Sequence, residues 1–147
     1  MGSVRLICTR ELFASHQLRC TRQREALFEI LRAAKTHPTA DELYRMLLAG
    51  GSCRMSRATV YNTLETLTAA GLVRRMPTTS GICRFDADTS DHLHVRVGES
   101  EIRDVPPELS KRLVAGIPPE ALRAIETHMG VSIENINIQL VAKNTRA

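Results

Sequence analysis

Tryptophan is absent from this sequence of 147 residues, and its only large aromatic side chains are two tyrosines and three phenylalanines. A surface that stacks the bases of single-stranded nucleic acid needs several exposed aromatic rings, so this scarcity argues against one. Long apolar runs are also missing: none approaches the length of a membrane span, and charges interrupt the stretch near the start where a secretory signal would be unbroken. The sequence therefore predicts a cytoplasmic protein with no membrane partner.

Closely spaced cysteine pairs are a further absence. The four cysteines are Cys8, Cys20, Cys53 and Cys83, and no two of them form a C-x-x-C pair. A structural zinc site normally needs such closely spaced thiolates. Because thiols stay reduced in a cytoplasmic protein, we expect four free cysteines and no cysteine-based structural zinc.

Charge is present but unevenly divided along the chain. The formal net charge is +4, and 43% of the residues are apolar, enough to form a packed core. Residues 1–85 hold 13 Lys/Arg and 6 Asp/Glu, a balance of +7, whereas residues 86–147 hold 7 and 10, a balance of −3. This division fits a module that binds a polyanion, joined to a second module of another kind. The alternative is an uneven solvated surface without a role.

Helix signals dominate the first half of the chain. We expect four helices: a short one over residues 11–18, a second after the N-cap Thr21, a third after Thr39 and a fourth capped by Ser56. The third opens with a capping box, in which Thr39 and Glu42 each satisfy a free amide of the other's turn. Apolar residues at helical spacing are expected to face the core. They are Leu27, Ile30, Leu31, Ala34, Leu43, Met46, Leu47, Val60, Leu64 and Leu67.

Two short extended runs follow these helices, at residues 72–76 and 82–85, around a turn-forming segment at 77–81. The second half, residues 86–147, has the pattern of a small α+β unit with three short strands and two helices. The strands are expected at 92–97, 101–105 and 133–141, and the helices from Pro106 to Val114 and from Pro118 to His128.

The predicted fold class is therefore α+β. An N-terminal winged helix-turn-helix domain (residues 1–85) is followed by a small C-terminal α/β dimerisation domain (residues 86–147). Dimerisation is expected because three short strands leave exposed edges and little core, and a second copy would cover both.

The fourth helix carries the side chains that are suited to reading double-stranded DNA. Arg57 and Tyr61 are four residues apart and share one helix face, with Asn62 beside them. Arginine can bind guanine with two hydrogen bonds, and asparagine can bind adenine in the same way. Further basic residues are expected to bind the DNA backbone or minor groove. They are Arg22 and Arg24 at a helix start, and Arg74, Arg75 and Arg84 on the hairpin.

Four segments of the first half resemble a known family. They are LRCTRQR at 18–24, HPTADELY at 37–44, SRATVYNTL at 56–64 and AGLVR at 70–74. These segments are similar to those of the ferric uptake regulator family of bacterial metal-responsive repressors, and the resemblance runs from about Leu12 to Val141. It implies a homodimer in which a winged-helix DNA-binding domain is joined to an α/β dimerisation domain.

The second half departs from the usual family pattern. Where typical members carry a His-rich segment and a C-x-x-C zinc site, this chain has Val95 and Gly98 at the cysteine positions and Ser90 at one His position. A His that is usual in the last strand is replaced near Ile136. The run around His92 is most similar to that of the iron response regulator branch, in which the His cluster is linked to haem or iron status. Cysteine-free peroxide-responsive members are the next most similar group.

Carried over residue by residue, the family's regulatory site falls on two aspartates and three histidines. They are His37, Asp86, His92, His94 and Asp104. Such a nitrogen and oxygen ligand set suits Fe²⁺, Mn²⁺ or Zn²⁺, and the ligand types do not choose among these metals. His92 and His94 are two residues apart, so on a strand they face the same side and can bind one ion or flank one haem.

The sequence therefore predicts a DNA-binding repressor that binds a double-stranded operator as a homodimer and responds to iron, haem or a related divalent metal. The alternatives are a constitutive DNA-binding regulator with a degenerate sensor and a peroxide-responsive regulator. We expect no enzyme, because no nucleophile with a partner base is evident in the sequence.

Overall fold

The computed structural model describes residues 7–51, 53–90, 92–99, 101–134, 136 and 138–143. The chain divides into two compact units, Met1–Ser90 and Asp91–Ala147. The sequence placed this boundary earlier, after residue 85. The difference arises because the second strand of the hairpin extends to Asp86, which pairs with Arg74 and so belongs to the first unit.

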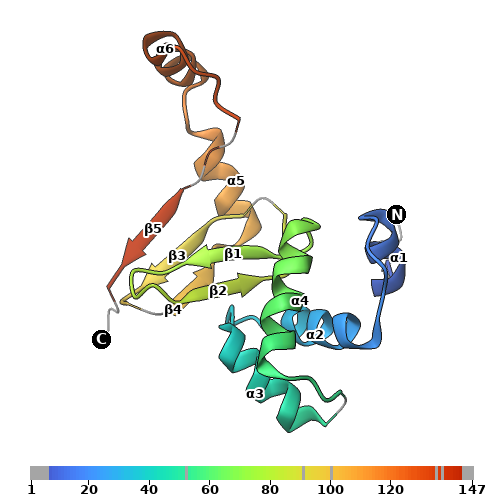
Figure 1. The fold of residues 1–147 in the computed structure, drawn as a ribbon. Helices are drawn as coiled ribbons and strands as arrows, with labels where there is room; N and C mark the ends of the chain where they lie inside the picture. Colours follow the sequence, from blue (N-terminus) through green and yellow to red (C-terminus); the bar gives the residue numbers. More distant parts are fainter. Residues whose placement is uncertain are drawn as a thin grey trace, which may run out of the picture. The chain divides into compact units, whose positions relative to one another are not determined.

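The described residues of the first unit form four helices and a hairpin, arranged as in Figure 1. Its elements are α1 (Thr9–Ser15), α2 (Arg22–Ala33), α3 (Ala40–Gly50), α4 (Arg57–Ala69), β1 (Arg74–Pro77) and β2 (Cys83–Asp86). This is the predicted winged-helix order. Both hairpin strands lie slightly later than expected, and α1 lies slightly earlier.

Side-chain caps fix the starts of the three main helices. The Thr21 hydroxyl accepts a hydrogen bond from the Arg24 amide at 3.3 Å, and Ser56 accepts one from the Thr59 amide at 3.1 Å. Thr39 and Glu42 form the reciprocal capping box at the start of α3. All three predicted caps are confirmed, and such a cap typically stabilises a helix by about 1 kcal/mol.

The core of the first unit is formed by apolar faces of α2, α3 and α4. Its central residues are fully buried, and include Leu27, Phe28, Leu31, Leu43, Leu47, Val60, Leu64 and Leu67. Phe13 of α1 joins them in an edge-to-face contact with Phe28, with ring centroids 5.3 Å apart. The prediction that Met46 faces the core is wrong, because its side chain is 38% exposed. Leu43 and Leu47, one turn apart, hold the centre of the buried face of α3, and Met46 lies at its border.

The hairpin is attached to the loop that joins α2 to α3. The Phe85 amide of β2 donates to the Pro38 carbonyl at 3.0 Å, and Thr39 forms an isolated antiparallel bridge with Arg84. The backbone between α2 and α3 therefore continues the edge of the hairpin beyond β2.

In the second unit, the residues that the structure describes form a three-stranded sheet and two helices. Its elements are β3 (His94–Val97), β4 (Glu101–Asp104), α5 (Pro107–Ala115), α6 (Pro119–Met129) and β5 (Gln139–Ala142), and the sheet order is β4-β3-β5. β3 pairs antiparallel with β4 and parallel with β5. β3 begins two residues later than predicted. The predicted strand over 133–141 is too long: the strand begins at Gln139, and residues 135 and 137 lie outside the described residues.

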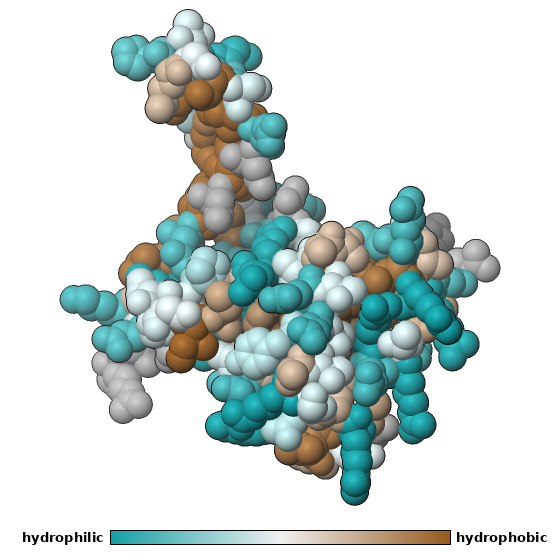
Figure 2. Space-filling model, viewed as in Figure 1, coloured by the Kyte–Doolittle hydropathy of each residue, from teal (hydrophilic) through white to brown (hydrophobic). Residues whose placement is uncertain are grey.

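The second unit buries few apolar side chains. Leu93, Ile102 and Val105 are buried beside Ser110, whereas α6 has no buried residue. Figure 2 shows hydrophobic side chains gathered over α5 and α6. The exposed apolar side chains of these two helices are Leu109, Leu113, Val114, Ile125 and Met129. No helix within the described ranges is long and apolar enough to cross a membrane.

Candidate functional site

The loop between α2 and α3 presents His37 to the end of the hairpin's second strand, at Asp86. His37 has a left-handed backbone, with φ of 50°, and only 2% of its surface is exposed. A left-handed conformation is uncommon for residues other than glycine, although histidine adopts it more readily than most. Such strain often marks a functional position.

Arg84 of β2 holds this loop in place. Its Nη1 donates to the His37 carbonyl at 2.9 Å and lies 3.3 Å from Oε2 of Glu42. The same Glu42 oxygen accepts a hydrogen bond from the Thr39 amide at 2.9 Å, which closes the capping box. The Arg84 side chain is 16% exposed, so it anchors the loop, and the expectation that it lies on the surface of the hairpin is wrong. Sequence reasoning missed this role, although Arg84 and Asp86 are two residues apart on one strand face.

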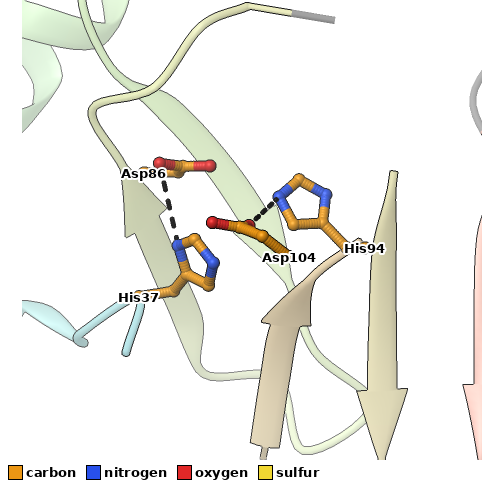
Figure 3. Close-up of side chains that lie close together, drawn as sticks. All are labelled: His37, Asp86, His94 and Asp104. Atoms are coloured by element: carbon orange, nitrogen blue, oxygen red, sulfur yellow. Dashed lines mark ion pairs between the residues drawn. The ribbon is translucent and has the colours of Figure 1, made fainter. Parts of the chain in front are cut away.

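Asp86 ends β2 and faces the His37 ring. Oδ1 of Asp86 lies 3.7 Å from Nδ1 of His37 (Figure 3). Both side chains are buried, and the same Asp86 oxygen accepts a hydrogen bond from the Asp88 amide at 2.8 Å. We call His37 and Asp86 the wing pair. It offers one imidazole and one carboxylate, and both of its residues belong to the first unit.

A second cluster of the same chemistry lies in the second unit. His94 on β3 and Asp104 on β4 are register partners, with Nε2 of His94 3.3 Å from Oδ1 of Asp104 (Figure 3). Nε2 of His92 lies 3.2 Å from the same oxygen, and the two imidazole ring centroids are 4.5 Å apart. His92 precedes β3, yet its ring meets the His94 ring at the same carboxylate, as the spacing of two predicts. We call His92, His94 and Asp104 the sheet cluster.

The wing pair and the sheet cluster both have the donor types of a site for a borderline divalent metal. Imidazole nitrogen suits Fe²⁺ and Zn²⁺, and carboxylate oxygen suits Mn²⁺. None of the five side chains is a thiolate.

The four cysteines are free thiols in the structure. Cys20 precedes the cap of α2, and burial raises the pKa of its thiol; the neighbouring Glu25 carboxylate raises it further. A raised pKa lowers the thiolate fraction at neutral pH, and the thiolate is the reactive form.

The residues predicted to read DNA bases share the exposed face of α4. Arg57, Tyr61 and Asn62 are all exposed, with Tyr61 at 48%. Arg57 is the first residue of α4 and contacts α3: its Nη1 lies 3.5 Å from Oδ1 of Asp41, and its guanidinium carbon lies 5.2 Å from the centroid of the Tyr44 ring. Neither contact was anticipated from the sequence.

The other four arginines predicted to bind DNA lie outside α4, two on α2 and two on β1. Arg22 is the exposed first residue of α2, and Arg24 is half-buried, with its Nη1 donating to the Arg19 carbonyl at 2.9 Å. Arg74 is half-buried and donates to the Thr89 carbonyl at 3.2 Å. Arg75 is exposed beside Cys83, with its Nη2 3.8 Å from the sulfur. The structure therefore brings together the three α4 residues and leaves these arginines on the start of α2 and on β1.

Fold and side chains together define a winged-helix protein that carries clustered imidazoles and carboxylates. A family model described as the ferric uptake regulator family matches residues 15–140. The chain belongs to this family.

Relatives and solved structures agree with this assignment. The chain is 41% identical over 78 residues to the peroxide-responsive repressor PerR of Staphylococcus saprophyticus, covering 53% of this chain and 52% of the relative. It is 44% identical over 77 residues to the peroxide operon regulator of Bacillus subtilis, covering 52% of each. The matched part thus spans about half the length of these relatives.

Solved structures match over almost the whole chain. The ferric uptake regulator of Pseudomonas aeruginosa with manganese is 26% identical with a TM-score of 0.68, covering 93% of this chain and 98% of that one. The peroxide stress regulator of Campylobacter jejuni is 26% identical with a TM-score of 0.63, covering 95% and 98%. The ferric uptake regulator of Vibrio cholerae shares the fold at 23% identity, with a TM-score of 0.69 and coverage of 93% and 100%. These matches confirm the predicted α+β fold class.

Proposed function

We propose that this chain is a metal-responsive transcriptional regulator that represses by binding a double-stranded operator, rather than an enzyme. The observation that carries the proposal is the wing pair. His37 and Asp86 lie at the junction of the hairpin with the start of α3, inside the unit whose α4 presents Arg57 and Tyr61. A metal ligand at His37 is connected by hydrogen bonds to the hairpin and to the start of α3, which lies beside the proposed DNA-reading helix α4.

The proposed DNA contacts fall into two kinds. Arg57, Tyr61 and Asn62 on α4 read bases in the major groove, because one exposed helix face is what that groove admits. Backbone phosphates are bound by the remaining basic residues. These are Arg22 and Arg24 at the start of α2, and Arg74 and Arg75 on the hairpin.

The proposed regulatory ligands, as the family resemblance implies them, are the wing pair of the first unit and the sheet cluster of the second unit. When bound, a divalent ion would supply positive charge to these ligands, which are His37, Asp86, His92, His94 and Asp104. Binding of the ion would then shift the population toward the DNA-competent state. Ring centroids of His92 and His94 only 4.5 Å apart leave no room for a porphyrin plane between the two rings. The proposal therefore takes an ion, and not a haem held between these two imidazoles.

Binding to DNA in the presence of each metal tests this function. A duplex enriched from a random pool by the Mn²⁺-loaded full chain would be titrated by fluorescence anisotropy with Fe²⁺, Mn²⁺, Zn²⁺, haem or no addition. We expect at least one divalent ion to tighten or weaken binding, and the paired substitutions His92→Ala and His94→Ala to abolish that response. His128→Ala, which removes an exposed histidine outside both groups of ligands, is the matched control. DNA binding that ignores every addition would instead favour a constitutive regulator with a degenerate sensor.

A peroxide response is the second candidate. Two observations favour it. The relatives named above are a peroxide-responsive repressor and a peroxide operon regulator, and the proposed ligands are all nitrogen and oxygen donors without a thiolate. We expect hydrogen peroxide to release DNA from the Fe²⁺-loaded protein and not from the Mn²⁺-loaded protein. Equal release from both would contradict a role for bound iron in the response.

Homodimerisation is part of the proposal. The second unit has little core of its own, and apolar side chains of its helices α5 and α6 are exposed. A second copy of the chain would remove these side chains from water, which is the main favourable term in protein association.

A further inference from the structure

The contact between α3 and α4 places a carboxylate beside the arginine that is proposed to read DNA. Oδ1 of Asp41 lies 3.5 Å from Nη1 of Arg57, and the side chains are 45% and 60% exposed. The Tyr44 ring lies one turn further along α3, with its centroid 5.2 Å from the Arg57 guanidinium carbon. The head of Arg57 is thus held by an anion and an aromatic ring of the same helix.

The backbone that carries Asp41 is fixed. Asp41 lies between the two partners of the capping box, Thr39 and Glu42, whose reciprocal hydrogen bonds are 2.9 Å and 3.2 Å. Glu42 is also paired with Arg84 of β2 at 3.3 Å. The backbone of Asp41 therefore has little freedom to move away when DNA approaches.

We propose that Asp41 is a specificity-determining residue, which weakens binding to DNA of the wrong sequence by competing for Arg57. This inference rests on the proposed function, because it concerns the same DNA-reading face. On random DNA, a phosphate competes with Asp41 for Arg57, and a move to the phosphate leaves the carboxylate unpaired beside a polyanion. At a guanine in the correct place, the five N–H donors of Arg57 allow two parallel hydrogen bonds to O6 and N7 while another N–H stays on Asp41. Asp41 therefore acts mainly against the wrong sequences.

The experiment compares two duplexes on the full, Mn²⁺-loaded chain. One is enriched from a random pool by the wild-type protein, and the other is a shuffled duplex of the same length and composition. Binding of each is measured by fluorescence anisotropy at one fixed salt concentration. For Asp41→Asn we expect the shuffled duplex to bind about threefold tighter and the enriched duplex to change little, so that the specificity ratio falls about threefold.

Two variants keep the result interpretable. Glu65→Gln removes one negative charge from the exposed face of α4, and Glu65 is not part of the Asp41–Arg57 contact; it should shift both duplexes alike and leave the ratio unchanged. Asp41→Glu keeps the charge and should restore most of the ratio, and circular dichroism checks that each variant is folded.

Two results would overturn the role of Asp41: a ratio that Asp41→Asn leaves unchanged, or one that Glu65→Gln lowers equally. A wild-type protein that enriches no duplex would instead refute the proposed function, and the role of Asp41 with it.

Discussion

Replacing Arg84 by glutamine should loosen the loop that carries His37, and both stability and metal binding should report it. Arg84 is mostly buried and makes two contacts through Nη1: one to the His37 carbonyl at 2.9 Å and one to Glu42 at 3.3 Å. A hydrogen bond from a charged donor contributes about 1.5–3 kcal/mol, whereas the pair with the half-exposed Glu42 contributes under about 1 kcal/mol. We expect a loss of about 2 kcal/mol in the free energy of unfolding, because glutamine can replace part of the carbonyl contact.

Metal binding should fall together with stability. Removing a residue that orients a metal ligand typically lowers metal affinity about tenfold or more. Urea unfolding of the metal-free full chain, at one fixed protein concentration, measures the first effect. Competition with a chelating dye for Mn²⁺ measures the second.

Arg75→Gln is the matched control, because it removes the same charge from an exposed position on the neighbouring strand β1. This control should change stability by less than about 0.5 kcal/mol. If Arg84→Gln and Arg75→Gln lose stability and metal affinity equally, the anchoring role derived for Arg84 is wrong.

Three further predictions concern other parts of the chain. Thr39→Ala should lower the free energy of unfolding by about 1 kcal/mol, because it removes the capping box of α3; thermal unfolding beside an exposed Thr127→Ala control would check this, and equal losses would contradict it. The rate of Cys20 alkylation by iodoacetamide should still rise at pH values where an unperturbed thiol is already mostly thiolate, because burial and Glu25 raise the pKa of Cys20. Mass spectrometry from pH 7 to pH 10 measures this rate. A rate that saturates at the pH of a free thiol would argue against the shift. Leu113→Glu should turn a dimer into monomer in light scattering, whereas an unchanged mass would mean that the apolar side of α5 is not the interface.

Local signals account for what could be predicted of the first unit. A cap and its partner lie within three residues of each other, so Thr21, Thr39 and Ser56 could be assigned from spacing alone. Helical periodicity also located the buried stripe of α4. It assigns a face only to within about one residue, however, and for that reason Met46 was placed inside the core.

In the second unit, local sequence signals did not predict the length of the last strand. Alternating apolar residues predicted a strand over 133–141, but pairing with β3 extends over only four positions of β5, from Gln139 to Ala142. Strand length is set by the partner strand, which the local pattern does not contain.

The candidate ligands could be named from residue type and family resemblance, whereas their geometry could not be predicted. His37 and Asp86 are brought together by Arg84, whose partner carbonyl is 47 positions away in the sequence. Similarly, the contact of Asp41 with Arg57 depends on how α3 packs against α4. Such contacts follow from tertiary structure and leave no local pattern in the sequence.

The left-handed backbone of His37 determines what a substitution there would measure. Alanine at this position would lose the imidazole and also be forced into a conformation that costs about 1–2 kcal/mol for an ordinary residue. Asparagine tolerates that conformation, so His37→Asn would leave the loop in place and remove only the ring nitrogens. The loss of metal affinity in His37→Asn would then measure the contribution of the imidazole. The additional loss of stability in His37→Ala would measure the free energy cost of the left-handed backbone.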